Sequence, residues 1–322
     1  MSIALAGDVK CPRLDETMPL CYNIIMDIQQ LKYFLAVARE GSVSRAAAYL
    51  YITQPSLTRQ MQNLEKETGR QLFVRGGRRM RLTESGELLF KRAEEIVELF
   101  DKTEKELMRP YGEIGGEIFI GGGETRAMKM ITDLAAFVRE KYPAIRFNLH
   151  SGDMADVCER LDKGLADFGL IIEPAELDKY EYVRLPVDDV WGVMMRRDDP
   201  LAAKDCVTRE DLAGVPLLRS RHSRDRSAVS EWIRGIPDAK IAATYNLLYN
   251  ASLMTESGIG KAVCIDGIVN TEGSGLCFKP LYPAVTSGIY VAWKKNQVFS
   301  KAASIFLREL LSRYSVLNEV GQ

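Results

Sequence analysis

The chain has 322 residues, a hydrophobic fraction of 46%, a charged fraction of 27% and a net charge of −1. This composition is ordinary for a globular protein with two or three domains, and no apolar run reaches the length of a membrane span. The two histidines exclude a His-rich metal site and argue against a His-based catalytic triad. The six scattered cysteines form no CxxC pair, which excludes a zinc spacing and favours reduced thiols.

Residues 1–25 lack the basic start and the unbroken apolar run of a signal peptide. We expect an extension there that is disordered or follows an upstream start, and we assign it no role. A helix then begins at a capping box formed by Asp27 and Gln30 and ends at Gly41. Its apolar stripe consists of Leu31, Phe34, Leu35 and Ala38.

The stretch from Gly41 to Gly69 predicts two short helices joined by a tight turn. Ser42 is expected to cap the first helix, and Pro55 to be the first residue of the second. Three apolar residues at helical spacing face inward: Leu57, Met61 and Leu64. The opposite face is polar and suits the DNA major groove, whereas the alternative for this helix pair alone is a hairpin with a solvated face. The predicted DNA contacts on this pair are Ser44, Gln54, Pro55, Ser56, Thr58, Arg59 and Gln62.

Residues 72–82 predict a two-stranded ribbon with a Gly76-Gly77 turn, which we call the wing. Arg75, Arg78 and Arg79 of the wing can enter a minor groove or hold phosphates. From Met26 to Arg81, ten Lys and Arg oppose four Asp and Glu, a net charge of +6, so the remainder of the chain carries −7. A basic module on an acidic body favours nucleic acid over a membrane.

Together these residues resemble the winged helix-turn-helix of LysR-type transcriptional regulators. The resemblance covers roughly residues 26–109 and is specific because helix, turn and wing agree at once. The residues that carry it are Leu31-Lys32-Tyr33-Phe34, Ser42, Arg45-Ala46-Ala47, Thr53-Gln54-Pro55-Ser56-Leu57-Thr58-Arg59-Gln60, Leu64-Glu65, Leu72-Phe73, Arg75 and Leu82-Thr83-Glu84-Ser85-Gly86. It implies a DNA-binding domain at 26–83, a linker helix and hinge at 84–112 and an effector-binding domain at 113–322.

Thr83 is expected to cap a long linker helix that ends near Arg109. One apolar stripe is predicted along it: Leu89, Ala93, Ile96, Phe100 and Leu107. The stripe needs a cover, either a helix of a second subunit or the body of the chain itself. The resemblance favours a homodimer, or a homotetramer built as a dimer of dimers, which would present reading helices to two half-sites.

From Gly116 onward, strands and helices alternate, which predicts a parallel sheet covered on both faces. Two lobes are expected, the first at 113–187 and 288–322, the second at 188–287. They resemble the type 2 periplasmic-binding-protein fold, the effector-binding half of LysR-type regulators. Strands are predicted at 117–121, 144–149, 167–172, 189–196, 216–219, 241–245, 262–265 and 288–294, and helices at 126–141, 153–163, 228–235, 247–257 and 300–314.

Ligands of open α/β sheets bind beyond the carboxyl ends of the strands, at helix amino ends. Glu124 departs from the small polar residue frequent in the family and argues against a simple anion at that helix end. Arginines 219, 221, 224 and 226 could hold an acid, or they could form a solvated loop. By the resemblance, effectors are held near Thr125, Ser151, Ser220 and Asn246. The complete predicted effector site is Gly123, Glu124, Thr125, Ser151, Glu173, Arg219, Ser220 and Asn246.

We therefore predict a cytoplasmic, non-catalytic transcriptional regulator that binds double-stranded operator DNA. An unidentified small-molecule effector in the cleft between the lobes would modulate it, without a cofactor, a metal or a membrane. The resemblance adds RNA polymerase as a further partner. Two alternatives stay open: an enzyme or solute-binding module with an incidental helix-turn-helix, and a regulator with an empty cleft that is controlled by protein level or by a thiol.

Overall fold

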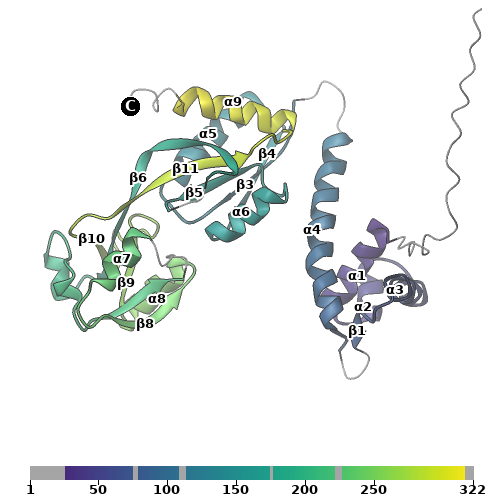
Figure 1. The fold of residues 1–322 in the computed structure, drawn as a ribbon, viewed down its shortest axis with the longest axis horizontal. Helices are drawn as coiled ribbons and strands as arrows, with labels where there is room; N and C mark the ends of the chain where they lie inside the picture. Colours follow the sequence, from purple (N-terminus) through teal and green to yellow (C-terminus); the bar gives the residue numbers. More distant parts are fainter. Residues whose placement is uncertain (1–25, 75–78, 109–113, 175–176, 222–226, 316–322) are drawn as a thin grey trace, which may run out of the picture. The chain divides into compact units, whose positions relative to one another are not determined.

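The computed structural model describes residues 26–74, 79–108, 114–174, 177–221 and 227–315 (Figure 1). Contacts between Cα atoms divide the chain into two units, Met1–Asp101 and Lys102–Gln322. The predicted extension at residues 1–25 lies outside the described residues.

The first unit consists of short helices, a small ribbon and most of a long helix. Its elements are α1 (Ile28–Glu40), α2 (Val43–Tyr49), α3 (Gln54–Thr68), β1 (Phe73–Val74), β2 (Arg81–Leu82) and α4 (Glu84–Leu107). β1 and β2 pair antiparallel, with Phe73 opposite Leu82, so the winged helix-turn-helix is confirmed.

Local caps begin the helices of this unit. In the capping box of α1, the Asp27 carboxylate accepts from the Gln30 amide at 2.7 Å, and the Gln30 side chain accepts from the Asp27 amide at 3.1 Å. The Ser42 side chain accepts from the Arg45 amide at the start of α2, and the Thr83 hydroxyl accepts from the Gly86 amide in α4. These three caps are as predicted. Helix α3, however, begins at Gln54, so Pro55 is its second residue and not its first as predicted.

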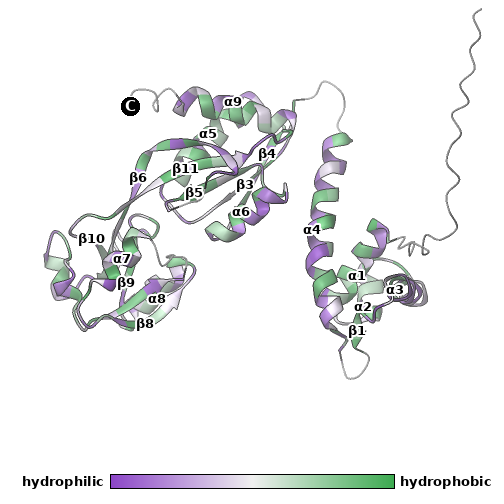
Figure 2. Cartoon of the chain, viewed as in Figure 1, coloured by the Kyte–Doolittle hydropathy of each residue, from purple (hydrophilic) through white to green (hydrophobic). Residues whose placement is uncertain are grey.

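The core of the first unit contains the apolar faces of all its helices. Phe34, Leu57 and Leu64 are fully buried, and the Phe34 and Phe73 rings lie 5.3 Å apart. Helix α4 contributes Ala93 and, at the edge, Leu89. The single predicted stripe on α4 is therefore wrong in part, because its first residues are covered by their own domain. The other three predicted residues, Ile96, Phe100 and Leu107, are exposed, together with Leu88 and Leu99. Figure 2 shows the alternation of hydrophobic and hydrophilic residues along this helix.

The second unit is a two-lobed α/β domain built on one sheet of nine strands. Its helices are α5 (Met128–Lys141), α6 (Met154–Asp162), α7 (Ala228–Arg234), α8 (Leu248–Glu256) and α9 (Lys301–Tyr314), with 3-10 turns η1 (Pro200–Ala203) and η2 (Glu210–Leu212). Its strands are β3 (Gly116–Gly122), β4 (Ile145–Ser151), β5 (Phe168–Ile172), β6 (Tyr180–Arg196), β7 (Pro216–Ser220), β8 (Lys240–Tyr245), β9 (Lys261–Ile265), β10 (Leu276–Pro280) and β11 (Thr286–Lys294).

The strand order is β4-β3-β5-β11-β6-β9-β7-β8, with β10 paired to β6. β3 is parallel to β4 and β5, and β7 is parallel to β8 and β9, as predicted. β6 and β11 run antiparallel to each other, and both contain the passage between the lobes. The first part of β6 pairs with β11, and its last part pairs with β9 and β10.

Helices cover both faces of the sheet in each lobe. In the first lobe α5 and α9 lie on one face and α6 on the other (Figure 1). Phe168 of β5 is fully buried there, 5.0 Å from the Phe306 ring of α9. In the second lobe α7 packs with one apolar cluster, which includes Trp232, and α8 packs with another, which includes Tyr245. The predicted two-lobed architecture is confirmed.

Two strands differ from the sequence prediction. β6 begins at Tyr180, nine residues before the predicted start at Asp189, and β10 was not predicted. Proline ordinarily breaks a strand, so the presence of Pro186 in the sequence argues against a strand over the first part of β6. The pairing with β11 skips residues 185–187 at a register shift, so Pro186 removes no ladder hydrogen bond.

Candidate functional sites

The outer face of α3 carries the predicted DNA-contacting residues. Leu57, Met61 and Leu64 are buried under it, which fixes the direction of the opposite face. The Thr58 hydroxyl donates to the Gln54 carbonyl at 2.9 Å and is half-buried. The predicted DNA contacts with exposed side chains on this face and on α2 are Ser44, Gln54, Pro55, Ser56, Arg59 and Gln62. Within the described part of the chain, Arg59 enters no ion pair, unlike Arg39 and Arg45, which pair with glutamates.

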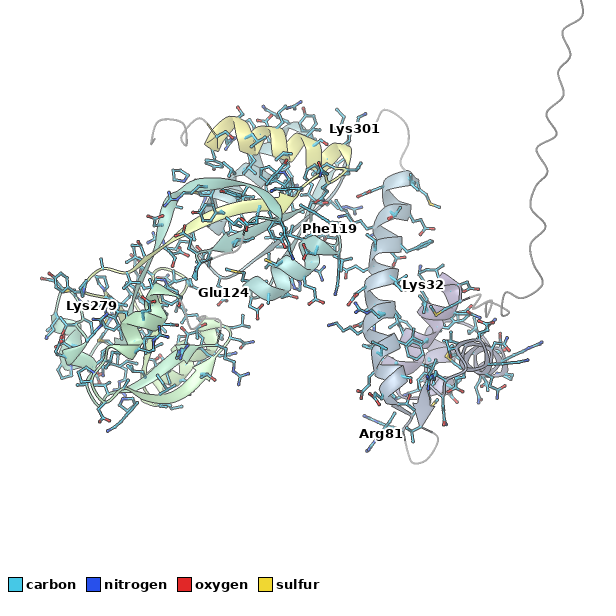
Figure 3. The ribbon with its side chains drawn as sticks, viewed as in Figure 1. Lys32, Arg81, Phe119, Glu124, Lys279 and Lys301 are labelled. Carbon is cyan, nitrogen blue, oxygen red and sulfur yellow. The ribbon has the colours of Figure 1, made fainter. Side chains whose placement is uncertain are left out.

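The Glu65 carboxylate of α3 binds the start of the wing. Glu65 Oε1 accepts from the amides of Leu72 and Phe73 at 2.8 and 3.2 Å. Arg79 is described and exposed beside the ribbon, and Arg81 of β2 is labelled in Figure 3. Arg75 and Arg78, also predicted to contact DNA, lie outside the described residues.

A cavity of about 390 Å³ opens between the two lobes of the α/β domain. The first lobe contributes the loops that follow β3, β4 and β5, and the second lobe contributes the ends of β7, β8 and β9 with the start of α8. Six of the eight predicted effector-site residues line it: Gly123, Glu124, Ser151, Glu173, Ser220 and Asn246. The cavity therefore lies at the edge of the sheet that the rule about the carboxyl ends of strands selects.

Much of the cavity wall was missed by the sequence prediction. It includes Trp191 of β6 and apolar side chains of β5, β9 and α8. The described apolar lining consists of Met154, Leu170, Ile171, Ile172, Pro174, Leu247, Leu248, Ile265 and Ile268. A pattern of strands and helices does not reveal which apolar residues of a strand end face the cavity, so no local signal identified these residues.

Glu124 extends from the first lobe to the second across this cavity (Figure 3). Its Oε2 atom accepts from the amide of Leu248, the first residue of α8, at 2.9 Å. Leu247 stands at the N-cap of α8 and offers no side-chain acceptor. The carboxylate of one lobe thus caps a helix of the other.

Glu173 is held at the rim of the cavity by strand β11. It accepts from the Gly288 amide at 3.0 Å and from the Tyr290 hydroxyl. The hydrogen bond from Tyr290 is the main reason that the pKa of Glu173 is lowered, and the Gly288 amide adds to it. Glu173 is therefore ionised at neutral pH.

The structure places Thr125 and Arg219 elsewhere than predicted, since neither belongs to the described cavity lining. Thr125 is buried and donates to Asp189 Oδ1 at 2.7 Å. Asp189 lies on β6 where the strand passes between the lobes, and its Oδ2 is buried with no hydrogen-bond partner among the described residues. Burial raises the pKa of Asp189 to about 6. Arg219 lies 3.5 Å from the Ser230 hydroxyl and is half-buried.

A second contact between the lobes lies near Asp189. Arg126, which precedes α5, forms an ion pair at 3.0 Å with Asp266, which follows β9. Both side chains are partly exposed, so this pair contributes little stability by itself. Together with the hydrogen bond between Glu124 and the Leu248 amide, it is a side-chain contact that links the two lobes.

The buried thiol at the cavity argues against redox chemistry there. Cys264 lines the cavity, and burial raises the pKa of its thiol to about 12. Burial also raises the pKa of Cys277. Because the thiolate is the reactive form, both cysteines are poorly reactive at neutral pH.

No group of three or more His, Cys, Asp or Glu side chains among the described residues is arranged to hold a metal ion. No described helix is both long and apolar enough to cross a membrane.

Two protein-family models match the chain. Residues 28–87 match the model of bacterial regulatory helix-turn-helix proteins of the lysR family, and residues 112–315 match the LysR substrate binding domain. The first match covers the helix-turn-helix and the wing. The second covers almost the whole two-lobed domain and more than half of the chain.

Curated relatives align over nearly the full length. A protein of Synechocystis named "Probable RuBisCO transcriptional regulator" is 28% identical over 91% of this chain and 88% of its own length. A Bacillus subtilis protein named "Uncharacterized HTH-type transcriptional regulator YybE" is 25% identical over 90% of this chain and 100% of its own length. A crystal structure of CbnR, a LysR family transcriptional regulator, shares the fold with a TM-score of 0.74 and 22% identity, over 90% of this chain and 99% of that one.

Proposed function

Because the chain belongs to the LysR family of bacterial transcriptional regulators, we propose that it reads operator DNA through the outer face of α3. It is a DNA-binding regulator with an effector-binding domain and is not an enzyme, which rules out the enzyme alternative. The observation that carries the proposal is the exposed set of Arg, Gln and Ser side chains on a helix whose other face is fully buried. Ser44, Gln54, Pro55, Ser56, Thr58, Arg59 and Gln62 contact the operator.

Arg59 is the side chain best suited to read a base. Its guanidinium can donate two hydrogen bonds to the O6 and N7 atoms of one guanine. Arginines of the wing, Arg75, Arg78 and Arg79, bind phosphates and add affinity without sequence preference. A solved CbnR structure that contains its target DNA has the same fold as this chain and supports DNA as the partner.

The proposal is tested with an operator selected from a random duplex library by the full chain. Arg59→Ala should weaken binding by about 1–3 kcal/mol and relax the preference at one base position. Arg79→Ala should weaken all sequences equally and lower the slope of affinity against salt by about 1. Arg139→Ala, an exposed arginine of α5, is the matched control. A selected sequence and a footprint that Arg59→Ala leaves unaltered would show that α3 does not read bases.

The protein acts as a homodimer, or as a homotetramer made of two dimers. The exposed apolar face of α4 supports this proposal, because Leu88, Ile96, Leu99 and Leu107 lie along one side of a helix. A second copy of α4 covers that face, and the dimer then presents two reading helices to two half-sites. Since its partners are chromosomal DNA and RNA polymerase, we place the protein in the cytoplasm.

A small molecule in the cavity between the lobes controls the regulator. The substrate-binding-domain match and the cavity at the expected strand ends support this proposal. An effector acts only if it binds one arrangement of the DNA-binding domains more tightly than another. At a hundred times its dissociation constant it adds about 2.7 kcal/mol of stability, so thermal unfolding of the full chain with a metabolite panel identifies it. Ser151→Ala and Asn246→Ala, in the cavity, should reduce the shift.

A further inference from the structure

The amino end of α8 faces the cavity and is already occupied by a carboxylate of the protein. The Leu248 amide donates to Glu124 Oε2 at 2.9 Å, and the N-cap residue Leu247 supplies no side-chain acceptor. A helix amino end favours anions, because its first amides lack partners within the helix and the helix dipole is positive there. In this chain Glu124 takes the position that a carboxylate or phosphate of a ligand would otherwise fill.

The charged groups around the cavity have the same sign. Its described lining contains three carboxylates, Glu124, Asp153 and Glu173, and no Lys or Arg. Glu173 is ionised, because its pKa is lowered by the hydrogen bond from Tyr290. Asp153 caps α6 through the Asp156 amide at 2.9 Å. A ligand anion placed here would be repelled by these groups.

The described basic side chains nearest to the cavity make contacts with the protein instead. Arg126 pairs with Asp266, and Arg221 donates to the Thr244 hydroxyl at 3.1 Å. Arg219 lies beside Ser230. Arg184, whose charge helps to lower the pKa of Glu173, forms an ion pair with Asp188. None of the four belongs to the described lining.

The remainder of the wall is apolar and would take a hydrocarbon body. Ile171 and Ile172 come from the first lobe, Leu247 and Ile265 from the second, and Trp191 from the strand that passes between them. At about 390 Å³ the cavity lies near the small end of the usual range for ligand pockets, ~300–1,000 Å³.

We infer that the effector of this regulator is a small amphipathic cation, an apolar body with a protonated amine or a similar donor-rich head that binds Glu124. The inference rests on the proposed effector cavity and specifies the chemical class of its ligand. The ligand head donates to the Glu124 carboxylate, which binds α8 at the same time and so joins both lobes through one group. A charge-assisted hydrogen bond of this kind favours the arrangement in which the lobes are closed on the ligand.

The experiment uses two matched sets of probes with the full chain: phenethylammonium, phenethyl alcohol and 3-phenylpropionate, then hexylammonium, hexanol and hexanoate. Binding is measured by ligand-detected NMR and by fluorescence of Trp191, which lines the cavity, with Trp191→Phe to identify that signal. The ammonium compounds should bind more tightly than the alcohols, and the carboxylates least.

Two substitutions at one position make the test specific. Glu124→Gln keeps an acceptor for Leu248 but removes the charge, so the ammonium compounds should lose about 10- to 100-fold in affinity. Glu124→Ala releases the Leu248 amide, so the carboxylates should gain affinity while the ammonium compounds lose it. Glu140→Ala, an exposed glutamate of α5, should alter neither. Thermal unfolding of each variant checks that it is folded.

The outcomes separate the ligand class from the proposed function. If 3-phenylpropionate and hexanoate bind the wild-type cavity in preference to the amines, the inference is wrong and the effector cavity stands. If no probe alters the Trp191 signal while the protein binds its selected operator, the cavity is not a ligand site, and both the inference and the proposed effector control fail. DNA binding is measured independently in both cases.

Discussion

Asp189 makes the stability of the α/β domain depend on pH in an unusual direction. The side chain is 4% exposed, Oδ1 accepts from the Thr125 hydroxyl at 2.7 Å, and Oδ2 has no described partner. Desolvation raises the pKa to about 6 from an ordinary 3.8, and the hydrogen bond from Thr125 opposes that shift only in part. Most structural carboxylates have a lowered pKa, so the folded protein loses their contribution to stability in acid. Asp189 has a raised pKa, so its contribution to stability increases in acid.

The sign and size of the effect follow from proton binding. Between pH 3.8 and pH 6 the folded state holds a proton on Asp189 that the unfolded state has released, so stability rises as the pH falls through this window. One pKa unit corresponds to about 1.4 kcal/mol, which gives about 3 kcal/mol in total. Asp189→Asn removes this titration. The free energy of unfolding of the wild type minus that of the variant should therefore rise by about 2 kcal/mol from pH 7.5 to pH 4, and the remainder appears below pH 4.

The comparison of two proteins over pH isolates this residue. The variant leaves an amide in place of the unpartnered oxygen, which adds a constant difference but no pH dependence. All three tryptophans, Trp191, Trp232 and Trp293, lie in the second unit, so urea unfolding followed by tryptophan fluorescence reports that unit alone. Asp205→Asn, at an exposed site of the same unit, is the control. A difference that is constant over pH, or that rises toward alkaline pH, would refute a buried carboxyl with a raised pKa.

Three further substitutions test the DNA-binding unit and its pairing. Gly86→Ala would place a Cβ 2.2 Å from the Leu72 carbonyl oxygen, so α4 should separate from the wing at a cost of about 1–3 kcal/mol. Hydrogen exchange of residues 72–90 measures this loss, and Glu87→Ala, at an exposed site, should leave the exchange unchanged. Normal protection in Gly86→Ala would contradict the close packing. Glu65→Ala leaves the Leu72 and Phe73 amides without their acceptor and should speed their hydrogen exchange about 10- to 100-fold. Lys66→Ala, the control, should leave their exchange unchanged. Equal exchange rates in Glu65→Ala and the wild type would mean that other contacts hold the wing. Leu99→Glu, at a side chain that is 42% exposed, should raise the dimer dissociation constant at least about 100-fold in sedimentation velocity, because each dimer loses two apolar contacts. Glu104→Ala, an exposed site on the same helix, is the control, and a wild type that stays monomeric would remove the α4 dimer from consideration.

Features that depend on neighbouring residues were predictable from the sequence. The capping box of Asp27 and Gln30, the cap at Ser42 and the cap at Thr83 each join residues three positions apart, so a short pattern contains all the information. The parallel strands of both lobes were predictable for a related reason, since alternation of strand and helix along the chain leaves few other arrangements.

Features that depend on distant residues were not predictable in the same way. The sequence analysis predicts that Thr125 contacts the effector, but its hydroxyl donates a hydrogen bond to Asp189, 64 positions away in the chain. Residues on α4 were assigned to one stripe, although the cover over Ala93 comes from the helices of its own domain. Glu124 was recognised as unusual, yet only the folded chain brings it to the amide of Leu248.

The seventeen-residue strand β6 limits how an effector signal can move through the domain. β6 pairs with β11 in the first lobe and with β9 and β10 in the second, so one strand is hydrogen-bonded to neighbours in both lobes. A free swing about a flexible tether would break those hydrogen bonds. The lobes can instead bend elastically at the register shift between Gly288 and Tyr290, where the pairing is already irregular. A response to the proposed effector would then be a graded change in sheet twist, with an amplitude set by the stiffness of β6 and β11.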